Sequence, residues 1–163
     1  MINQLKETLG RRIMVLDGAM GTMIQRYHLA EEDFRGAEFA SHPVKLAGDN
    51  DLLAITRADV ISAIHREYLE AGADIITTCT FNAQAISQAE YGMQSAVRDM
   101  NRAAVALARA EAERMTALTP EKPRFVAALW VLRVRRLLCR PMWMTPHAEL
   151  SILRCCARHI VSR

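Results

Sequence analysis

Three short apolar segments separated by long helical ones constrain the fold of this chain more than any other feature. They span 13–17, 73–81 and 124–128, and they are rich in the branched apolar residues that strands favour. Between them lie amphipathic, helix-forming stretches, the longest from about 94 to 117. Strands that alternate with helices of this length predict parallel β/α units, whose right-handed crossovers bring the carboxyl ends of the strands to one edge. The predicted fold class is therefore α/β.

Local signals predict several of the helices. Residues 2–9 predict a short amphipathic helix, and residues 23–50, which show no regular period, predict a long loop or a pair of short helices. The next helix is expected to begin at Thr56, whose side chain would cap it together with Asp59. Gly72 is expected to end it.

The first strand ends in residues suited to ligand binding. The unbroken apolar run 13–17 predicts a strand buried on both faces, with Asp17 at its carboxyl end. Gly18 and Gly21 allow the backbone to turn sharply and to approach a ligand. Asp17 then either faces a cationic group, such as a substrate ammonium, or caps the backbone of a tight turn. A second polar strand end, Thr78–Asn82, falls on the same edge and favours the ligand-binding interpretation.

Composition excludes several classes of protein. The chain has 163 residues, 51% of them hydrophobic, which fits one domain or a piece of a larger one. No stretch approaches the roughly 20 apolar residues of a membrane span, and residues 1–12 lack the apolar core of a signal peptide. We therefore expect a cytoplasmic protein with no membrane partner. Its four cysteines are too few and too unevenly placed for a disulfide framework.

The charge of the chain changes abruptly near residue 128. Residues 1–128 carry 14 Lys and Arg against 17 Asp and Glu, a net charge of −3. Residues 129–163 carry 7 Arg, no Lys and one acid, a net charge of +6, and they hold both tryptophans. Such a break is abnormal inside one small domain. It predicts a domain portion at 1–128 followed by a non-native basic tail at 129–163.

Six stretches of the first 128 residues resemble the homocysteine-binding domain of cobalamin-dependent methionine synthases, in the same order and at the same spacing. The stretches are Val15–Gln25, Asp33–Gly36, Asn50–Leu53, Glu70–Ile76, Thr80–Asn82 and Thr119–Arg124. The second and the last of them favour this enzyme over the related alternative, a betaine- or S-methylmethionine-dependent homocysteine methyltransferase.

The resemblance implies a (β/α)8 barrel of the TIM type, of which this chain holds about three of the eight strands. In such enzymes a zinc ion activates homocysteine as a thiolate, which takes the methyl group of methylcobalamin, itself recharged by 5-methyltetrahydrofolate. The resemblance places Asp17, Gly18 and Ala19 at the amino acid end of the homocysteine pocket, and Thr80 is a further expected substrate-binding residue. Zinc and cobalamin are the implied cofactors, and the enzyme's own folate and cobalamin domains are the implied partners.

The resemblance assigns no catalytic residue and no metal ligand to this chain, because the family's zinc-binding cysteines lie further along. Where relatives often have Glu-Thr-Asn-Thr-Phe, Thr77–Phe81 reads Thr-Thr-Cys-Thr-Phe, so an acid and an amide are missing. Cys79 is a candidate metal ligand, but a lone buried cysteine is more often a small apolar residue. Cys155 and Cys156 are adjacent, as two of the family's zinc ligands are, yet they lack the glycine-rich surroundings of those ligands.

The genetic code connects the basic tail to the family sequence. When the third base of each codon is joined to the first two of the next, Trp130-Val131 must encode glycine and Met142-Trp143 must encode valine. The two pairs within Trp143–Thr145 must both encode aspartate, so the shifted frame can read Ser-Pro-Asp-Val-Asp-Asp-Pro, as in the family. We therefore interpret the tail as translated out of frame.

Three functional hypotheses of different classes follow. In the first, the chain is part of a homocysteine methyltransferase domain. In the second, it is a truncated product that is inactive alone, with an open edge strand at 124–128 that invites aggregation. In the third, the basic tail binds nucleic acid through its phosphates. The resemblance supports the first two together, and no nucleic-acid partner is expected.

Overall fold

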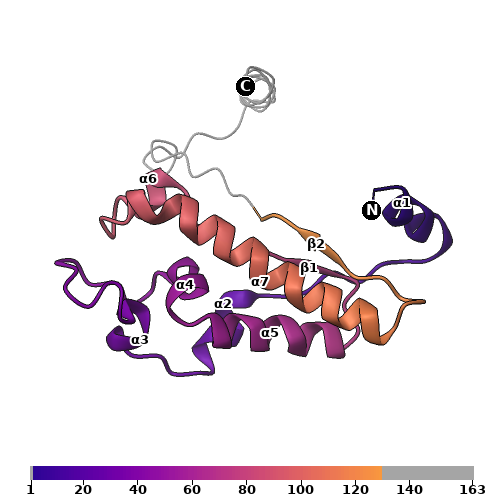
Figure 1. Cartoon of the computed structure of the whole chain (residues 1–163), viewed down its shortest axis with the longest axis horizontal. Helices are drawn as coiled ribbons and strands as arrows, with labels where there is room; N and C mark the ends of the chain where they lie inside the picture. The colour runs from indigo at the N-terminus through magenta and orange to yellow at the C-terminus, as the bar shows by residue number, and fades with distance from the viewer. Residues whose placement is uncertain (1, 130–163) are drawn as a thin grey trace, which may run out of the picture. The chain divides into compact units, whose positions relative to one another are not determined.

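The computed structural model describes residues 2–129, in which short strands alternate with helices as the sequence predicts (Figure 1). The tail from 130 to 163 lies outside the described residues, and so do the codon pairs and cysteines discussed for it. The elements are α1 (Ile2–Arg11), α2 (Met20–Gln25), α3 (Glu31–Arg35), η1 (Asn50–Leu52), α4 (Leu53–Thr56), α5 (Ala58–Glu70), β1 (Ile75–Thr77), α6 (Ala85–Gln88), η2 (Gln94–Ala96), α7 (Val97–Leu118) and β2 (Phe125–Ala127).

The described sheet is small and parallel, which confirms the predicted α/β class. Strand β1 pairs with β2, with Ile75 opposite Phe125. On its other edge β1 accepts the segment after α1 through a parallel bridge between Leu16 and Ile75. Backbone hydrogen bonds from Asp17 N to Ile75 O (2.9 Å) and from Asp74 N to Val15 O (2.8 Å) hold this segment in place. The sheet therefore has three parallel rows of extended backbone: the segment 13–17, which is the first row, then β1 in the middle, and β2.

The prediction that residues 13–17 are buried on both faces is wrong for the described structure. Ile13 is 90% exposed, and Val15 and Leu16 are 54% and 55% exposed. The segment is the outer row of the sheet, with β1 on one side only, so backbone pairing does not by itself cover its side chains. An apolar run predicts extended backbone here but not the neighbours that would bury it.

Helices α5 and α7 form the layer that packs against the sheet. They lie side by side and contact each other, and α7 also packs against β2 (Figure 1). Ala104, Ala108 and Ala112 are buried at intervals of four residues, so this row of α7 carries small side chains that let its neighbours approach closely. Ile61 and Met100 are fully buried in the larger of the two apolar clusters.

The start of α5 differs from the sequence prediction. Thr56 belongs to α4, and its Oγ1 is buried without a hydrogen-bond partner among the described residues. Arg57 occupies the N-cap position instead, and its guanidinium binds the carboxylates of Asp59 and Asp33. The predicted end of the helix is confirmed, because Gly72 follows the last turn with a φ of +111°.

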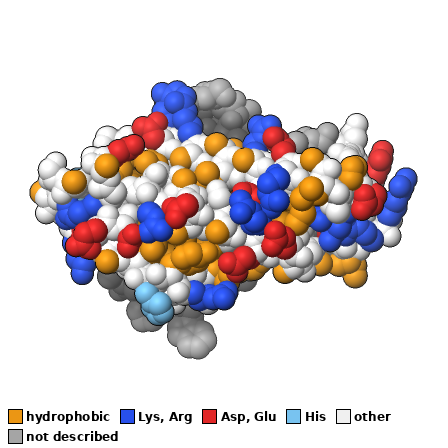
Figure 2. All heavy atoms as spheres, turned by 60° about the horizontal axis from the view of Figure 1, so that its bottom comes forward, with side chains coloured by type: hydrophobic (Ala, Val, Ile, Leu, Met, Phe, Trp, Pro, Cys, Tyr) orange, Lys and Arg blue, Asp and Glu red, His pale blue; other side chains and the backbone are white. Residues whose placement is uncertain are grey.

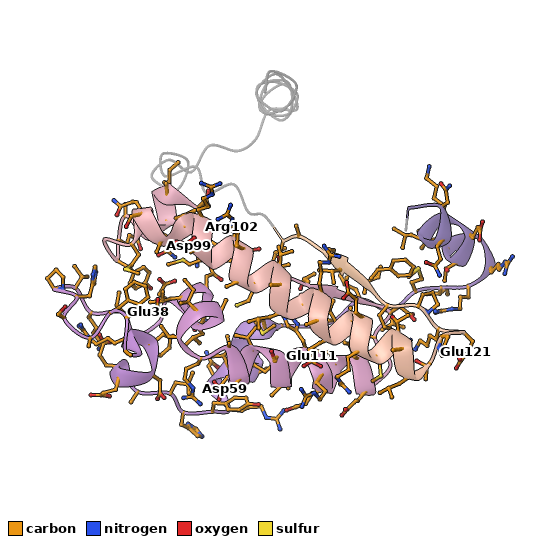
Figure 3. All side chains as sticks on the ribbon, viewed as in Figure 1. Glu38, Asp59, Asp99, Arg102, Glu111 and Glu121 are labelled. Atoms are coloured by element: carbon orange, nitrogen blue, oxygen red, sulfur yellow. The ribbon has the colours of Figure 1, made fainter. Side chains whose placement is uncertain are left out.

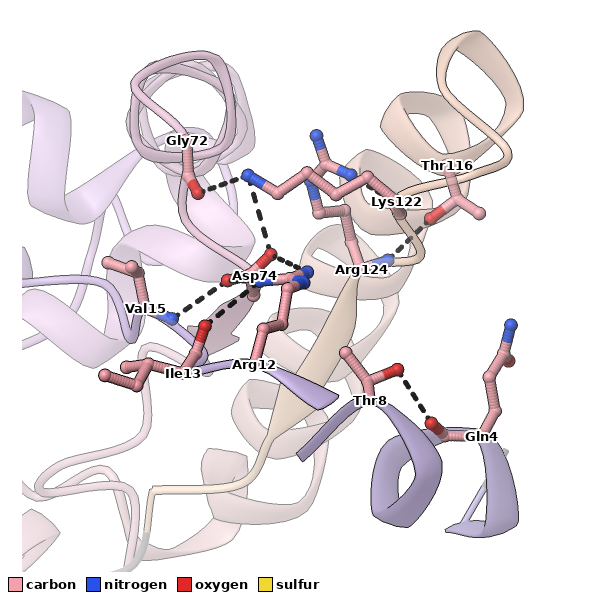
Figure 4. Close-up of polar contacts among 10 residues, drawn as sticks. All are labelled: Gln4, Thr8, Arg12, Ile13, Val15, Gly72, Asp74, Thr116, Lys122 and Arg124. Atoms are coloured by element: carbon pink, nitrogen blue, oxygen red, sulfur yellow. Dashed lines mark hydrogen bonds and ion pairs between the residues drawn. The ribbon is translucent and has the colours of Figure 1, made fainter. Parts of the chain in front are cut away.

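One buried carboxylate joins all three rows at the amino-terminal edge of the sheet (Figure 4). Asp74 is 1% exposed and accepts two hydrogen bonds of 2.7 Å from the guanidinium of Arg12. It also accepts the backbone N–H of Val15 (2.9 Å), and the ammonium of Lys122 lies 3.5 Å away. Arg12 precedes the first row, Asp74 precedes β1 and Lys122 precedes β2, so the cluster aligns the starts of the rows. The Arg12 guanidinium holds the pKa of the Asp74 carboxyl well below its usual range.

Within residues 2–129, the apolar helices are too short, and the long ones too polar, to cross a membrane. The face drawn in Figure 2 shows Lys and Arg side chains interspersed with Asp and Glu, with apolar groups between them. Such a mixture is typical of a solvated helix surface.

Candidate functional site

Asp17 lies at the carboxyl end of the first row and binds the neighbouring strand. Its Oδ2 accepts the backbone N–H of Thr77 at 2.7 Å, and its Oδ1 accepts the Thr77 hydroxyl at 3.0 Å. The carboxylate is half-buried, and burial raises its pKa, although the hydrogen bonds from Thr77 act in the opposite direction. Asp17 therefore caps backbone, which is the second of the two interpretations of the sequence. Because its carboxylate is only half-buried, it could also bind a cation.

The turn after Asp17 depends on close packing rather than on unusual backbone angles. Neither Gly18 nor Gly21 has a positive φ. A Cβ on Gly18 would lie 3.0 Å from the hydroxyl of Tyr68, so a side chain there would displace the tyrosine. That hydroxyl donates a long hydrogen bond of 3.4 Å to the carbonyl of Ala19. Gly18 and Ala19 are both exposed, which leaves their backbone open to a ligand.

Thr80 serves a different part of the structure from the other three predicted residues. It is 5% exposed, and its hydroxyl lies 2.7 Å from that of Thr78 and donates to the carbonyl of Leu129 at 2.5 Å. The Leu129 N–H in turn donates to the Thr78 hydroxyl at 3.1 Å. Thr80 thus joins the segments that directly follow β1 and β2, called their exits below. Within the described residues it forms no hydrogen bond with Asp17.

A buried acidic turn at residues 49–51 lies against the segment that follows β1; it overlaps the family stretch Asn50–Leu53, to which the sequence analysis assigns no role. Asp51 is 3% exposed and accepts the backbone N–H of Asn82 and, weakly, the thiol of Cys79 at 3.8 Å. Asp49 is 2% exposed and accepts the side-chain amide of Gln88 at 2.8 Å. Burial, reinforced by the nearby Asp49, raises the pKa of Asp51 to about 6. A sequence signal was available, because Asp51 lies in Asn50–Leu53, one of the stretches that resemble the family.

The sequence model of the homocysteine S-methyltransferase family matches residues 14–131, which is most of the chain. The chain belongs to the homocysteine S-methyltransferase family. The match covers every described strand and all but the first of the described helices.

Two solved structures of the homocysteine methyltransferase MmuM from Escherichia coli share the fold of this family member. The oxidized form is 24% identical with a TM-score of 0.58, over 76% of this chain and 39% of that one. The metallated form is 20% identical with a TM-score of 0.63, over 90% of this chain and 49% of that one. The chain therefore spans less than half the length of either protein.

The structure explains one stretch on which the family resemblance was based, Asp33–Gly36. The Asp33 carboxylate accepts the N–H of Ala30 and pairs with Arg57, and Phe34 is buried in the core. The Arg35 guanidinium binds the backbone carbonyls of residues 39, 40, 42 and 44 and so holds the following loop. Gly36 has a φ of +52°, and a Cβ there would lie 3.1 Å from the side chain of Thr56. The described contacts of this stretch therefore anchor the loop that follows it.

The described residues of this family member do not fit a zinc ion. Across residues 2–129 no three His, Cys, Asp or Glu side chains converge to hold a metal. Cys79 is a buried free thiol that donates to the carbonyl of Asn50 at 3.5 Å, and burial raises its pKa well above the usual value. Since a cysteine binds a metal ion as its thiolate, a buried site that favours the neutral thiol opposes the metal-ligand interpretation of Cys79.

Proposed function

We propose that the chain is the amino-terminal part of the homocysteine-binding domain of a cobalamin-dependent methionine synthase. The observation that carries the proposal is the family match over residues 14–131, together with the six ordered stretches that resemble this enzyme. The domain portion is 1–128, and 129–163 is a tail translated out of frame. In the complete enzyme, the sulfur of homocysteine would lose its proton and accept a methyl group, which methylcobalamin would supply when bound.

In this proposal Asp17 receives the amino group of homocysteine. Support comes from its half-buried carboxylate at the carboxyl edge of a parallel sheet, where ligands of such folds bind. The exposed backbone of Gly18 and Ala19 leaves room beside it. Thr80 contributes by fixing the neighbouring strand exits through its hydroxyl, since its hydrogen bonds go to Thr78 and Leu129.

The same proposal holds the isolated chain to be inactive. The chain spans less than half the length of the matched structures, and its described residues do not fit the zinc ion that the family resemblance implies. A fragment of a betaine- or S-methylmethionine-dependent homocysteine methyltransferase is the alternative. The two are distinguished by whether downstream coding sequence specifies cobalamin and folate domains.

Asp17→Asn is expected to weaken homocysteine binding by about 10- to 150-fold in the frame-restored, full-length protein. A hydrogen bond to a charged partner contributes about 1.5–3 kcal/mol, and the substitution removes the charge while keeping the shape. An asparagine oxygen can still accept the Thr77 N–H, so the fold is expected to survive. Isothermal titration calorimetry with homocysteine measures the change in affinity.

Thr77→Val is the matched control for this experiment. It removes the hydroxyl that donates to Asp17 but leaves the carboxylate charge and the backbone hydrogen bond in place. Affinity for homocysteine should therefore change much less than in Asp17→Asn. If Asp17→Asn lowers the melting temperature and leaves affinity unchanged, Asp17 is a structural turn residue and the assignment is wrong.

The reading frame of the gene provides an independent prediction. Shifting the frame once near codon 128 should continue the family sequence past Tyr-Arg-Glu-Ser, which codons 159–163 can encode in the shifted frame, because the forced glycine, valine and aspartates before it already match the family. Resequencing the coding DNA through codons 126–163 and beyond checks this. An intact single frame with no family sequence in the alternative frame would show that the tail is native.

A further inference from the structure

The acidic turn at 49–51 binds the segment that follows β1 and lies close to the start of α2, just after the Asp17 turn. The side-chain amide of Asn50 lies 3.6 Å from the position that a Cβ on Gly21 would occupy, at the start of the helix that follows the Asp17 turn. On its other side Asp51 accepts the N–H of Asn82, just after β1. The turn thus lies between two segments that are about sixty residues apart in sequence.

The contacts of the turn with the exit of β1 are buried and specific. Asp51 receives both the Asn82 N–H and the Cys79 thiol, while Gln88 donates to Asp49 at 2.8 Å and to the carbonyl of Asn82 at 3.4 Å. Gln88 is fully buried, and its Oε1, like Oδ2 of Asp49, has no hydrogen-bond partner among the described residues. Buried hydrogen bonds of this kind restrict the motion of the backbone segment that they hold.

We propose that Asp51 is a positioning residue, which holds the exit of β1 at residues 79–82 in register with the Asp17 turn. The substrate side of this inference rests on the proposed function, whereas the positioning itself concerns only the chain described here. Asp51 touches no reacting atom in this account. It acts through the backbone of Asn82 and the side chain of Cys79, and so through the strand exit that also carries Thr80.

The protonation state of Asp51 decides how well it can hold the exit. The ionised carboxylate offers acceptors to both Asn82 and Cys79, and protonation converts one oxygen into a donor. Asp49 on the same turn and the Cys79 thiol on the strand exit are the titratable groups that act on it in the described structure. Burial raises the pKa of Asp51 to about 6, so the closed exit binds a proton more readily than an opened, solvated one, and the exit is expected to open less often as the pH falls through that value.

Amide hydrogen exchange of the 163-residue chain tests the proposal directly. In Asp51→Ala the amide of Asn82 loses its acceptor, and exchange of residues 79–84 is expected to accelerate by about tenfold or more at pH 7.5, since local opening sets the rate. Asp51→Asn retains an acceptor oxygen and should keep most of the protection. It should also abolish the slowing of exchange that the wild type shows between pH 7 and pH 5, after correction for intrinsic exchange.

Asp99→Asn is the matched control, because Asp99 is exposed on α7 (Figure 3) and forms no hydrogen bond or ion pair with residues 49–51 or 79–84 in the described structure. It should exchange like the wild type at residues 79–84 at every pH. Unchanged exchange in Asp51→Ala, or a wild-type pH profile in Asp51→Asn, would overturn the proposal. If Asp51→Ala does not fold, the pH profile of Asp51→Asn alone decides. The Asp17→Asn titration fails or succeeds independently, so failure of the proposed function is distinguishable from failure of the positioning role.

Discussion

Asp74→Ala is expected to lower the free energy of unfolding by about 2–4 kcal/mol, because it leaves Arg12 and Lys122 side by side without their shared anion. Removing one member of a buried ion pair costs about 3–5 kcal/mol. The loss of stability is expected to be smaller here, because Arg12 and Lys122 are each about a third exposed and can rehydrate. The backbone N–H of Val15 also loses its acceptor. Urea denaturation followed by circular dichroism at pH 7.5 measures the loss.

Two further variants separate charge from shape at this position. Asp74→Asn keeps the shape and is expected to lose nearly as much stability as the alanine variant, because the charge that Arg12 and Lys122 share is gone. Glu113→Gln is the control, since Glu113 forms an exposed pair with Arg109 at 3.2 Å and its loss should cost less than about 0.5 kcal/mol. A loss in Asp74→Ala no larger than in Glu113→Gln would show that the cluster contributes little to the fold.

The sequence predicted the elements whose signals are local. Helix α7 ends at Leu118, one residue beyond the predicted end. The prediction succeeds because an alanine-rich stretch favours helix without help from distant residues. Strands β1 and β2 fall inside their predicted segments, and Gly72 ends α5 as expected. These features depend on neighbours a few positions away, which the sequence displays directly.

The sequence did not predict features that depend on distant partners. The sequence predicts that Asp74 belongs to a strand, whereas its role follows from Arg12, 62 positions earlier. The start of α5 is set by Arg57, whose guanidinium reaches Asp33, 24 positions away, so the local capping pattern at Thr56 was misleading. The exposure of residues 13–17 likewise depends on what lies beside the sheet.

The candidate site could be predicted in position but not in its contacts. Asp17 was placed at the carboxyl end of the first strand, and the pairing of that strand with β1 supports this placement. The residue that Asp17 contacts, Thr77, lies 60 positions away, and no local pattern identifies it. Asp51 was missed for the same reason, since its partner Asn82 is 31 positions further along.

Replacement of His65 is expected to stabilise the chain specifically at acidic pH. His65 lies on α5, is fully buried, and neither ring nitrogen has a hydrogen-bond partner among the described residues. Burial lowers its pKa from 6.5 to about 4, although the charge of Glu111 on α7 acts in the opposite direction (Figure 3). The folded state therefore binds its proton less readily than the unfolded state, and stability is lost as the pH falls from 6.5 to about 4.

The expected loss is about 3 kcal/mol, since each unit of pKa difference corresponds to about 1.4 kcal/mol. Asp51 acts in the opposite direction over almost the same range. Its pKa is raised from 3.8 to about 6, so its burial costs stability at neutral pH, and this cost is relieved as the pH falls through 6. The pH profile of the wild type alone would therefore conceal both effects, and the difference between variant and wild type is the informative quantity.

The unfolding free energy of His65→Leu minus that of the wild type is expected to grow by about 3 kcal/mol between pH 7.5 and pH 4, because leucine binds no proton in either state. Urea denaturation at half-unit steps of pH measures this difference, and His65→Met repeats it should leucine fit poorly. His28→Asn is the control, since His28 is exposed and its φ of +50° suits asparagine. It reports what the loss of an exposed imidazole does to the same measurement. A constant difference for both His65 variants would mean that the imidazole is protonated as readily in the folded chain as in the unfolded one, and that its burial between α5 and α7 does not govern acid stability.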